Sequence, residues 1–520
     1  MRETLPKGWI ISSLGNVSTH PQYGWTCRSN KKGAIKLLRT TDVSNGKINW
    51  EQVPFCEKEP DNVDKYILKV NDILVSRAGS VGISYRISKD DLAYKTVFAS
   101  YLIRFCPYNP ASFVAYYFKS HQYWQFISDT QLGIAVPNVN ATKLSKLPIP
   151  LPPLNEQKRI VAKLDAIIPR IDLLKARLDK IPALIKRFRQ SVLTAAVTGK
   201  LTETWREEHP EVESADLLLE KIKNERKSLK RKHKTGYSFK TDFHIDERYI
   251  SLTIPNSWEK TNIDLVSLYI VDCPHSTPKW ADSGHICLRT TNFLSNKLNL
   301  SEVRYVSKDT YKKRIERLKP EKGDVLYSRE GGILGIACIL NSDEDVCLGQ
   351  RMMMFRTSKN IITEYFSFYL NSPIFLQHVK NLIGGSAAPH INIRDIKKYP
   401  FPLPPLEEQK EIVRQVDKFF TLADKLEVHY QKAKTRIDKL SQSVLAKAFR
   451  GELTPQDPND EPAEKLLERI MAEKAKMESA LKGSKKKGGG QKAKAGSREL
   501  DEKVVSSILE LTTQHGAITA

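Results

Sequence analysis

The chain repeats itself at a constant spacing of 252 residues. The stretch LPIPLPPLNEQK at Leu147–Lys158 returns as YPFPLPPLEEQK at Tyr399–Lys410. GKLT at Gly199–Thr202 returns as GELT at Gly451–Thr454 with the same spacing, so no insertion separates these elements. The ends of the two copies are well kept and the middles diverge. This pattern predicts a fixed scaffold that presents two different recognition surfaces.

Weaker matches continue upstream in the same order. They are Pro6…Trp9 with Pro255…Trp258, Leu38–Thr41 with Leu288–Thr291, and Asp72–Arg77 with Asp324–Arg329. Within each copy, short apolar runs such as Ile73–Val75 are typical of strands. Stretches such as Phe113–Phe126 and Tyr365–Val379 have the pattern of amphipathic helices rich in aromatic residues. Each copy is therefore expected to begin with a mixed α/β domain.

The charge of the chain narrows the class of partner. Its 520 residues are too many for one ordinary core, and 83 Lys and Arg against 60 Asp and Glu give a formal charge of +23. A surplus of this size favours binding to a polyanion, most often nucleic acid. The alternative is an ordinary protein with a basic tail, but without Lys485–Lys494 the remaining chain is still strongly basic.

Cysteine usage and hydropathy indicate the compartment. The seven cysteines include no Cys-x-x-Cys pair, which favours reduced thiols over zinc ligands or disulfides. There is no apolar run long enough to span a membrane and no signal peptide at the N-terminus. We expect a cytoplasmic protein without a bound metal.

A heptad pattern follows each Pro-Pro pair. Apolar residues recur at alternating steps of four and three from Ile160 to Val192 and again from Ile412 to Val444. Both sets form a/d seams, so the two copies are expected to pack on each other as a coiled coil. Roughly 35 residues at about 1.5 Å each would give a rod of about 50 Å. The seam residues include Ile160, Leu164, Ile171, Leu174 and Leu178, with Ile412, Val416, Phe419, Leu426 and Ile437.

Two prolines conflict with the first seam. Pro169 and Pro182 lie inside it, whereas the second copy has Thr421 and Lys434 there. Because proline removes a backbone donor and disturbs a helix interior, the first helix is expected to be bent and the second straighter. Further along, Ala215–Leu229 and Ala463–Met477 share a charged helical pattern.

The motifs of common DNA enzymes are missing. The sequence has no phosphate loop, no Asn/Asp-Pro-Pro-aromatic tetrapeptide and no Gly-rich turn suited to a nucleotide cofactor. Glu156 and Glu408 fall in the first turn of a predicted helix, where a carboxylate usually serves the helix dipole. Trp9 and Trp258 are interpreted as packing anchors. These features favour a chain that recognises nucleic acid over an enzyme with an unfamiliar active site.

At this point the motifs match a known family. The chain resembles the specificity (S) subunits of type I restriction-modification systems over residues 1 to about 480. The resemblance rests on LPKGW at Leu5–Trp9, the two Pro-Pro-Leu-x-Glu-Gln elements, LIKRFRQ at Leu184–Gln190 and SVLAKAFRGELT at Ser443–Thr454. It implies that each globular half is a target recognition domain that reads one part of a bipartite DNA sequence. Two helical regions would pair antiparallel and set the unread spacer.

The resemblance also implies the partners. Two methyltransferase subunits would hold S-adenosylmethionine and methylate adenine at N6. Two motor-nuclease subunits, using ATP and Mg²⁺, would complete the restriction enzyme. This chain itself would bind double-stranded DNA and no cofactor. The alternative is a DNA-binding scaffold or orphan specificity protein without an active methyltransferase partner.

The expected organisation has pseudo-two-fold symmetry. The α/β (α+β) recognition domains span 1–150 and 251–402, the conserved helical regions 151–200 and 403–452, and a charged linker 201–250. A charged helical extension at 453–480, a disordered Lys/Gly-rich tail at 481–498 and a short terminal helix at 499–520 complete the chain.

The candidate DNA-binding residues are arginines near predicted strand ends and polar residues in the loop before each Pro-Pro element. Arginine can pair with guanine or grip phosphate, and asparagine or histidine can contact adenine or the backbone. Positions that recur in both copies favour phosphate contact or a role in the fold over base choice. The candidates are Arg39, Arg77, Asn138 and Asn140 in the first domain, and Arg289, Arg329, Arg351, His390 and Asn392 in the second.

Overall fold

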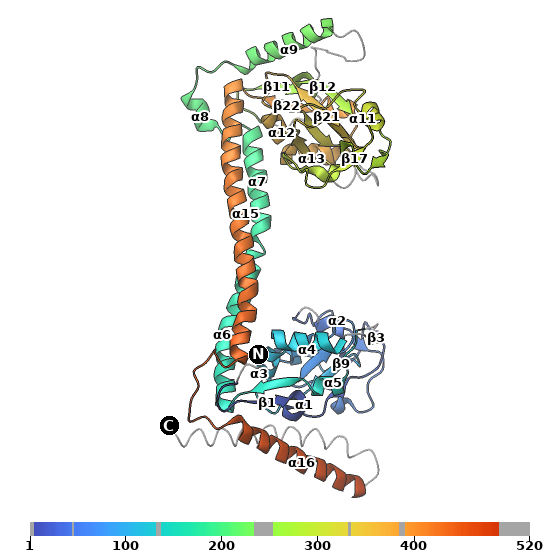
Figure 1. Cartoon of the computed structure of the whole chain (residues 1–520), viewed down its shortest axis with the longest axis vertical. Coiled ribbons are helices and arrows are strands. Elements are labelled where there is room, and N and C mark those ends of the chain that lie inside the picture. The colour runs from blue at the N-terminus through green and yellow to red at the C-terminus, as the bar shows by residue number, and fades with distance from the viewer. Residues whose placement is uncertain are drawn as a thin grey trace. The chain divides into compact units, whose positions relative to one another are not determined.

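The computed structural model describes residues 5–43, 46–131, 137–232, 253–330, 334–383 and 390–487 (Figure 1). The chain divides into two compact units. Met1–Leu178 and Lys432–Ala520 form the first unit, and Asp179–Gln431 forms the second. No helix among the described residues is long and apolar enough to cross a membrane.

The first unit contains two small four-stranded sheets and a two-stranded one. One sheet is antiparallel and has the order β2-β9-β6-β7; the other has the order β3-β5-β4-β8 and includes a parallel β4–β8 pair. The strands are β1 (Ile10–Ser13), β2 (Gln22–Tyr23), β3 (Ser29–Asn30), β4 (Lys36–Leu38), β5 (Phe55–Cys56), β6 (Ile73–Ser76), β7 (Ser84–Arg86), β8 (Thr96–Phe98), β9 (Leu102–Phe105) and β10 (Pro148–Leu151). The helices of this domain are α1 (Leu14–Val17), α2 (Thr40–Val43), α3 (Ala111–Tyr117), α4 (His121–Gln131) and α5 (Ala141–Ser145).

The second unit repeats this topology. Its sheets have the orders β12-β21-β18-β19 and β13-β17-β14-β20, with a parallel β14–β20 pair and an added β15–β16 hairpin. The strands are β11 (Glu259–Asn262), β12 (Ser267–Asp272), β13 (Trp280–Ala281), β14 (His285–Leu288), β15 (Phe293–Leu294), β16 (Lys297–Leu298), β17 (Arg304–Val306), β18 (Val325–Ser328), β19 (Ala337–Ile339), β20 (Val346–Leu348), β21 (Met352–Thr357) and β22 (Pro400–Leu403). The helices are α10 (Ile263–Val266), α11 (Lys308–Arg314), α12 (Thr363–Asn371), α13 (Pro373–Ile383) and α14 (Ile393–Ile396). The predicted duplication of a mixed α/β domain is confirmed.

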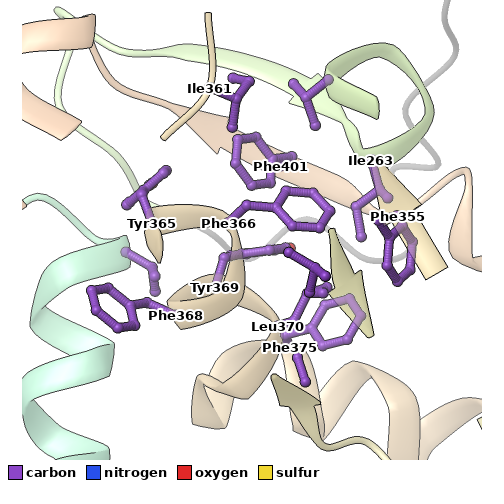
Figure 2. Packing of buried hydrophobic residues seen from close by; sticks show 14 of the residues in the cluster. Ile263, Phe355, Ile361, Tyr365, Phe366, Phe368, Tyr369, Leu370, Phe375 and Phe401 are labelled. Carbon is purple, nitrogen blue, oxygen red and sulfur yellow. The ribbon is translucent and has the colours of Figure 1, made fainter. Parts of the chain in front are cut away.

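Aromatic side chains of α12 fill the core of the second unit. Figure 2 shows Phe366 against Phe401, with ring centroids 5.5 Å apart, and Phe368 on the side of α12 toward α7. The hydroxyl of Tyr365 donates to the carbonyl of Pro402 (2.9 Å), and that of Tyr369 donates to the carbonyl of Pro400. Among the described strands, β22 pairs with β11 alone. Proline is tolerated in such an edge strand, and the tyrosines satisfy its buried carbonyls.

The two helical regions pair antiparallel within each unit. They consist of α6 (Leu154–Leu178) followed by α7 (Ile181–Val197), and of the continuous α15 (Leu406–Phe449). In the first unit Lys175 forms an ion pair with Asp438 (3.4 Å). In the second, Arg189 forms an ion pair with Asp424. The first unit also joins Glu156 to Thr454, and the second also joins Thr202 to Glu408. Within each unit the partner numbers therefore fall as the numbers along the first helical region rise, which confirms the predicted antiparallel arrangement.

The prolines in the first helical region have different effects. Helix α6 continues through Pro169. The interruption lies at residues 179–180, and Pro182 occupies the first turn of α7. Because the N–H groups of a first turn have no partner within the helix, proline costs nothing there. The first region is therefore interrupted at residues 179–180, whereas α15 runs without a break.

The seam is buried at some of its positions, including Ile185 and Tyr430, and open at others. Ile160, Leu164 and Ile171 are buried in α6, as are Ile412 and Val416 in α15. Leu178, Phe419 and Ile437 are half-buried. The prediction was wrong for Leu174 and Leu426, which are 45% and 47% exposed. Ile168 is buried in place of Ile167, because a straight α-helix drifts out of a strict seven-residue repeat.

A docked helix follows each helical region. Helix α8 (Glu203–Glu208) leads to α9 (Ala215–Lys232), and α15 leads to α16 (Ala463–Lys487). Their buried residues correspond at a spacing of 248, as Leu218 with Leu466 and Ile222 with Ile470. Because α16 continues to Lys487, residues 481–487 are helical, and the predicted start of a disordered tail at 481 was wrong. The rest of that tail and the predicted terminal helix lie outside the described residues.

Candidate nucleic-acid interface

The motif shared most clearly by the two copies has a structural role. Glu156, in the first turn of α6, accepts hydrogen bonds from Trp9 Nε1 (2.8 Å) and Gln456 Nε2 (2.7 Å). Its carboxylate therefore joins the start of the domain, the start of α6 and the segment after α15. Burial, the largest effect, raises the pKa of Glu156, while the bonds from Trp9 and Gln456 oppose the shift.

Glu408 forms the matching junction in the second unit. It accepts from Trp258 Nε1 (2.8 Å) and Thr202 Oγ1 (2.7 Å), and it pairs with Arg206 (2.9 Å). Its exposed fraction is 1%, the same as that of Glu156. The two carboxylates thus fix the domains to the helices, and both tryptophans are buried anchors.

The glutamine of each motif completes the junction. Gln157 Nε2 donates to the carbonyl of Pro152 (2.9 Å), and its Oε1 accepts from Asn109 (3.1 Å). Gln409 Nε2 donates to Pro404 (3.0 Å), and its Oε1 accepts the N–H of Ile362 (2.9 Å). Since these shared residues are occupied in the scaffold, a surface that recognises ligand has to use other side chains.

Four loops of the first domain are tied together by backbone hydrogen bonds. Ala99 N–H donates to Leu38 (2.9 Å), Arg77 N–H to Tyr101 (2.9 Å) and Val139 N–H to Arg77 (3.0 Å). These bonds connect the loops that follow β4 and β6, the turn between β8 and β9, and the segment before α5. We name this arrangement the first loop cluster; it comprises residues 39–42, 77–82, 99–101 and 137–140.

The second domain repeats the same three bonds. Gly349 N–H donates to Leu288 (2.8 Å), Arg329 N–H to Arg351 (3.1 Å) and Ile391 N–H to Arg329 (3.0 Å). The second loop cluster comprises residues 289–292, 329–330, 334–335, 349–351 and 390–392. All nine candidate DNA-binding residues lie in these two clusters, so residues far apart in the sequence come together. Whether each one contacts DNA stays a prediction.

The shared arginines after β6 and β18 have different surroundings. The Arg77 guanidinium lies over the ring of Tyr23, 4.9 Å from its centroid, and is half-buried. Arg329 is 7% exposed and faces Asp272 (3.4 Å) and Glu330 (3.2 Å). Its charge is thus compensated within the domain, whereas the cation–π contact leaves the charge of Arg77 in place.

The arginines before the two short loop helices support the fold. Arg39 forms an ion pair with Asp42 (2.9 Å), and this hydrogen bond is the main reason that the pKa of Arg39 is raised. The backbone of Arg289 donates to Asn292 (2.8 Å), and its guanidinium donates to the carbonyl of Glu302 (3.2 Å). Both are half-buried, and these contacts agree with the expectation that shared positions favour the fold or phosphate contact.

Of the polar residues before the Pro-Pro elements, two lie at the start of a short helix and two form isolated β-bridges. Asn140 Oδ1 accepts from the N–H of Lys143 (2.8 Å) as the N-cap of α5, and Asn392 precedes α14 and donates to Asp395 (3.3 Å). Asn138 and His390 form β-bridges to Ala78 and Glu330. Asn138 Oδ1 and Arg77 Nε are buried without a hydrogen-bond partner among the described residues. Such unsatisfied groups call for an explanation, and a ligand is one.

Two residues of this site were not among the sequence candidates: Tyr101, which lies in the first loop cluster, and Tyr23, which lies at its border. Tyr23 supports Arg77, and its hydroxyl accepts the N–H of Ala141 (3.0 Å). Tyr101 is 60% exposed. No sequence signal distinguished Tyr101 from a core position. Only the register of the sheet reveals that it belongs to the loops.

Comparisons with known proteins agree with this architecture. The family model of the type I restriction modification DNA specificity domain matches residues 6–183 and 276–433. The chain belongs to this family. It is 28% identical over 505 residues to the type I restriction enzyme EcoKI specificity subunit of Escherichia coli strain K12, covering 93% of this chain and 99% of that protein. It is 29% identical to the EcoBI specificity subunit of Escherichia coli, covering 92% and 94%.

Solved structures share the fold. The HsdS subunit from Thermoanaerobacter tengcongensis aligns with a TM-score of 0.51 at 18% identity, covering 87% of this chain and 99% of that one. A chain from work on complex assembly and conformational transition of the type I R-M system aligns with a TM-score of 0.58 at 19% identity, covering 86% and 100%. The resemblance noted from the sequence motifs is confirmed.

Proposed function

We propose that this chain selects the DNA sequence on which a type I restriction-modification enzyme acts, with each loop cluster reading one half of a bipartite target. The observation that supports this most directly is the repetition of one loop framework in two domains whose loop side chains differ. A reader of two unlike half-sites needs the same docking geometry twice and different contacts at each site.

The charge of the chain suits this role. A formal charge of +23 favours a polyanion. Lysine and arginine contacts to phosphates would give salt-dependent affinity, and a few side chains at base edges would give sequence choice. In the first cluster, the uncompensated cation of Arg77 is the strongest candidate for contact with DNA.

The paired helices would set the length of the unread spacer. Helices α6 and α7 run antiparallel to α15, so lengthening one region without the other would break the pairing. Inserting one seven-residue repeat into both regions should therefore lengthen the spacer and leave both half-site sequences unchanged. Footprinting of such a variant that finds the original spacer would remove this part of the proposal.

The catalytic work would belong to partner subunits. The relatives are named as specificity subunits of restriction enzymes, and the sequence lacks motifs for nucleotide-driven motion or methyl transfer. We propose two methyltransferase subunits that hold S-adenosylmethionine, and two motor-nuclease subunits that use ATP and Mg²⁺. In this proposal the chain is non-catalytic, binds no cofactor itself, and works in the cytoplasm, where it meets cellular and incoming DNA.

Methylome sequencing tests the proposed function. DNA would be compared between a host that expresses this chain with its methyltransferase subunit and the same host with this gene deleted. A bipartite motif with N6-methyladenine in each half, lost on deletion, is the expected result. A stable complex that methylates no motif would favour the alternative of an orphan specificity protein, and methylation by the purified chain alone would revive an enzyme.

A further inference from the structure

Tyr101 and Arg351 occupy the same position in the two loop clusters. Each precedes an inner strand of its sheet, β9 or β21, and the strand registers pair Ser76 with Leu102 and Ser328 with Met352. The carbonyl of Tyr101 accepts the N–H of Arg77, and that of Arg351 accepts the N–H of Arg329. One framework position therefore presents a phenol in one domain and a guanidinium in the other.

Both side chains lie on the surface. Tyr101 is 60% exposed and Arg351 is exposed. A tyrosine of this exposure contributes little to the core, so packing does not explain its presence. Arg351 makes no ion pair with any carboxylate in the described part of the chain. The fold thus leaves both side chains available to a ligand.

The backbone at Arg351 adds an independent observation. Its φ is +68°, a conformation that residues with a side chain rarely adopt. Strained residues of this kind persist where the surroundings hold them, and they gather at ligand-binding sites. The turn is held tightly, because a Cβ on Gly349 would lie 2.6 Å from the carbonyl oxygen of Leu288.

The positions of the accessible cations differ between the clusters. In the first cluster, Arg77 is supported by an aromatic ring and keeps its charge beside Tyr101. In the second, the matching Arg329 is buried beside Asp272 and Glu330. The exposed arginine of the second cluster is Arg351, whereas Arg289 is half-buried and donates to the carbonyl of Glu302. The accessible cation therefore follows β6 in the first cluster and precedes β21 in the second.

We propose that the position shared by Tyr101 and Arg351 determines base choice in each half-site. This inference rests on the proposed function. A residue that contacts phosphate is expected to be of the same type in both domains. At this position the residue type differs between the domains, although the surrounding backbone hydrogen bonds are repeated. Arg351 is suited to pair with the O6 and N7 atoms of a guanine in the major groove. Tyr101 is suited to an apolar contact with a thymine methyl group and a hydrogen bond from its hydroxyl.

The test selects DNA from a random library with the full-length chain in complex with its partner subunits, followed by sequencing. Tyr101→Ala removes the phenol. Arg351→Asn removes the cation, and asparagine tolerates the left-handed backbone. Arg351→Lys keeps the charge and loses bidentate pairing. Lys297→Ala is the matched control, because it removes an exposed charge on β16, outside the loop cluster.

The expected results separate the two half-sites. Wild-type protein should select a two-part motif. Tyr101→Ala should weaken base preference about 5- to 160-fold at one or two positions of one half, and Arg351→Asn should do so in the other. Arg351→Lys should lose the guanine preference but keep most of the affinity, and Lys297→Ala should keep the motif.

Two results would overturn the inference in distinguishable ways. Variants that keep both halves of the motif while affinity falls evenly would show that these side chains serve the backbone of DNA, and the proposed function would stand. A folded wild-type complex that enriches no motif would overturn the proposed function together with this inference. Circular dichroism of each variant confirms that the fold is retained.

Discussion

Arg226 and Lys474 occupy equivalent positions 248 residues apart, and each donates hydrogen bonds to the end of a short helix in its own unit. Arg226 on α9 donates to the carbonyls of Asp264 and Ser267, around α10. Lys474 on α16 donates to those of Gly15 and Ser18 (2.8 Å), around α1. Each cation satisfies carbonyls that a helix end leaves unpaired. The helix after each coiled-coil segment is thereby fixed to a recognition domain.

Replacing Arg226 by alanine should loosen α9. The side chain is 1% exposed, so its loss removes hydrogen bonds from the carbonyls of Asp264 and Ser267 inside the unit, at a cost of about 1–3 kcal/mol. Hydrogen exchange measured by mass spectrometry should show faster exchange in residues 215–232. Arg226→Lys reproduces the residue found in the first unit and is the control. Equal exchange in the alanine variant, the lysine variant and wild type would contradict the assigned role.

The two buried glutamates should respond differently to loss of charge. Glu408→Gln leaves Arg206, whose side chain is 21% exposed, without its counter-charge, and should lower the free energy of unfolding by about 1–3 kcal/mol. Glu156 accepts from neutral side chains, so Glu156→Gln should cost less than about 1 kcal/mol. Urea unfolding of both variants at pH 7 makes the comparison. A larger loss for Glu156→Gln would contradict the difference in pairing.

The pH dependence of stability should report on Glu156. Burial raises the pKa of its carboxyl above the ordinary value of 4.5, so the folded state binds the proton more tightly than the unfolded state. Its contribution to stability is present below about pH 4.5 and is lost as the pH rises through the folded pKa. Glu156→Gln should therefore gain stability relative to wild type from pH 4.5 to pH 7. Parallel curves for the two proteins over this range would contradict the shift.

Glycines in the repeated Gly-x-Leu-Thr elements should not tolerate a side chain. Gly199 and Gly451 both have φ near +76°, and a Cβ would lie 2.3 Å from the Cγ of Pro255 or Pro6. Gly199→Ala and Gly451→Ala should each destabilise their unit by about 1–3 kcal/mol through backbone strain and this clash. Thermal unfolding of each variant measures the loss. Gly46→Ala is the control, because it has a positive φ with open space around it and so separates strain from the clash.

The two arginines after β6 and β18 should serve different purposes. Arg77→Ala should weaken DNA binding and lower the magnitude of the salt dependence by about one unit without lowering the melting temperature, because a single phosphate or base contact is lost. Arg329→Ala should mainly lower the melting temperature, because it leaves the half-buried Asp272 and Glu330 without this cation. Filter binding at several salt concentrations, with thermal unfolding, distinguishes them. Arg77→Lys should retain most of the salt dependence.

The scaffold could be predicted from the sequence because its motifs occur in two copies. A constant spacing of 252 residues aligned the two helical regions, and apolar periodicity over several turns identified them as a coiled coil. The sheets could not be derived in the same way. Many of their strands have only two to four residues, too few for an apolar pattern to define partners or direction.

Only part of the site could be predicted from the sequence, and Glu156 shows the physical reason. A glutamate in a first helical turn usually serves the helix dipole, and its true partner, Trp9, lies 147 residues away. The arginines were proposed because their side chains can pair with guanine or grip phosphate; Arg39 and Arg77 recur as Arg289 and Arg329, whereas Arg351 does not recur. The equivalence of Tyr101 and Arg351 was not found, because the two residues share no identity and correspond only through strand pairing.

The division of the chain into units has a consequence for its synthesis. The second unit is one continuous segment, Asp179–Gln431, whereas the first needs Lys432 and the residues beyond it. At about 5–20 residues per second, the ribosome takes roughly 13–50 s to pass from Leu178 to Lys432. During that time Glu156 lacks Gln456, and the apolar face of α6 is uncovered. The recognition domain of the first unit is thus encoded first and completed last. A chain that stops before Lys432 would lack a complete first unit and would keep the second.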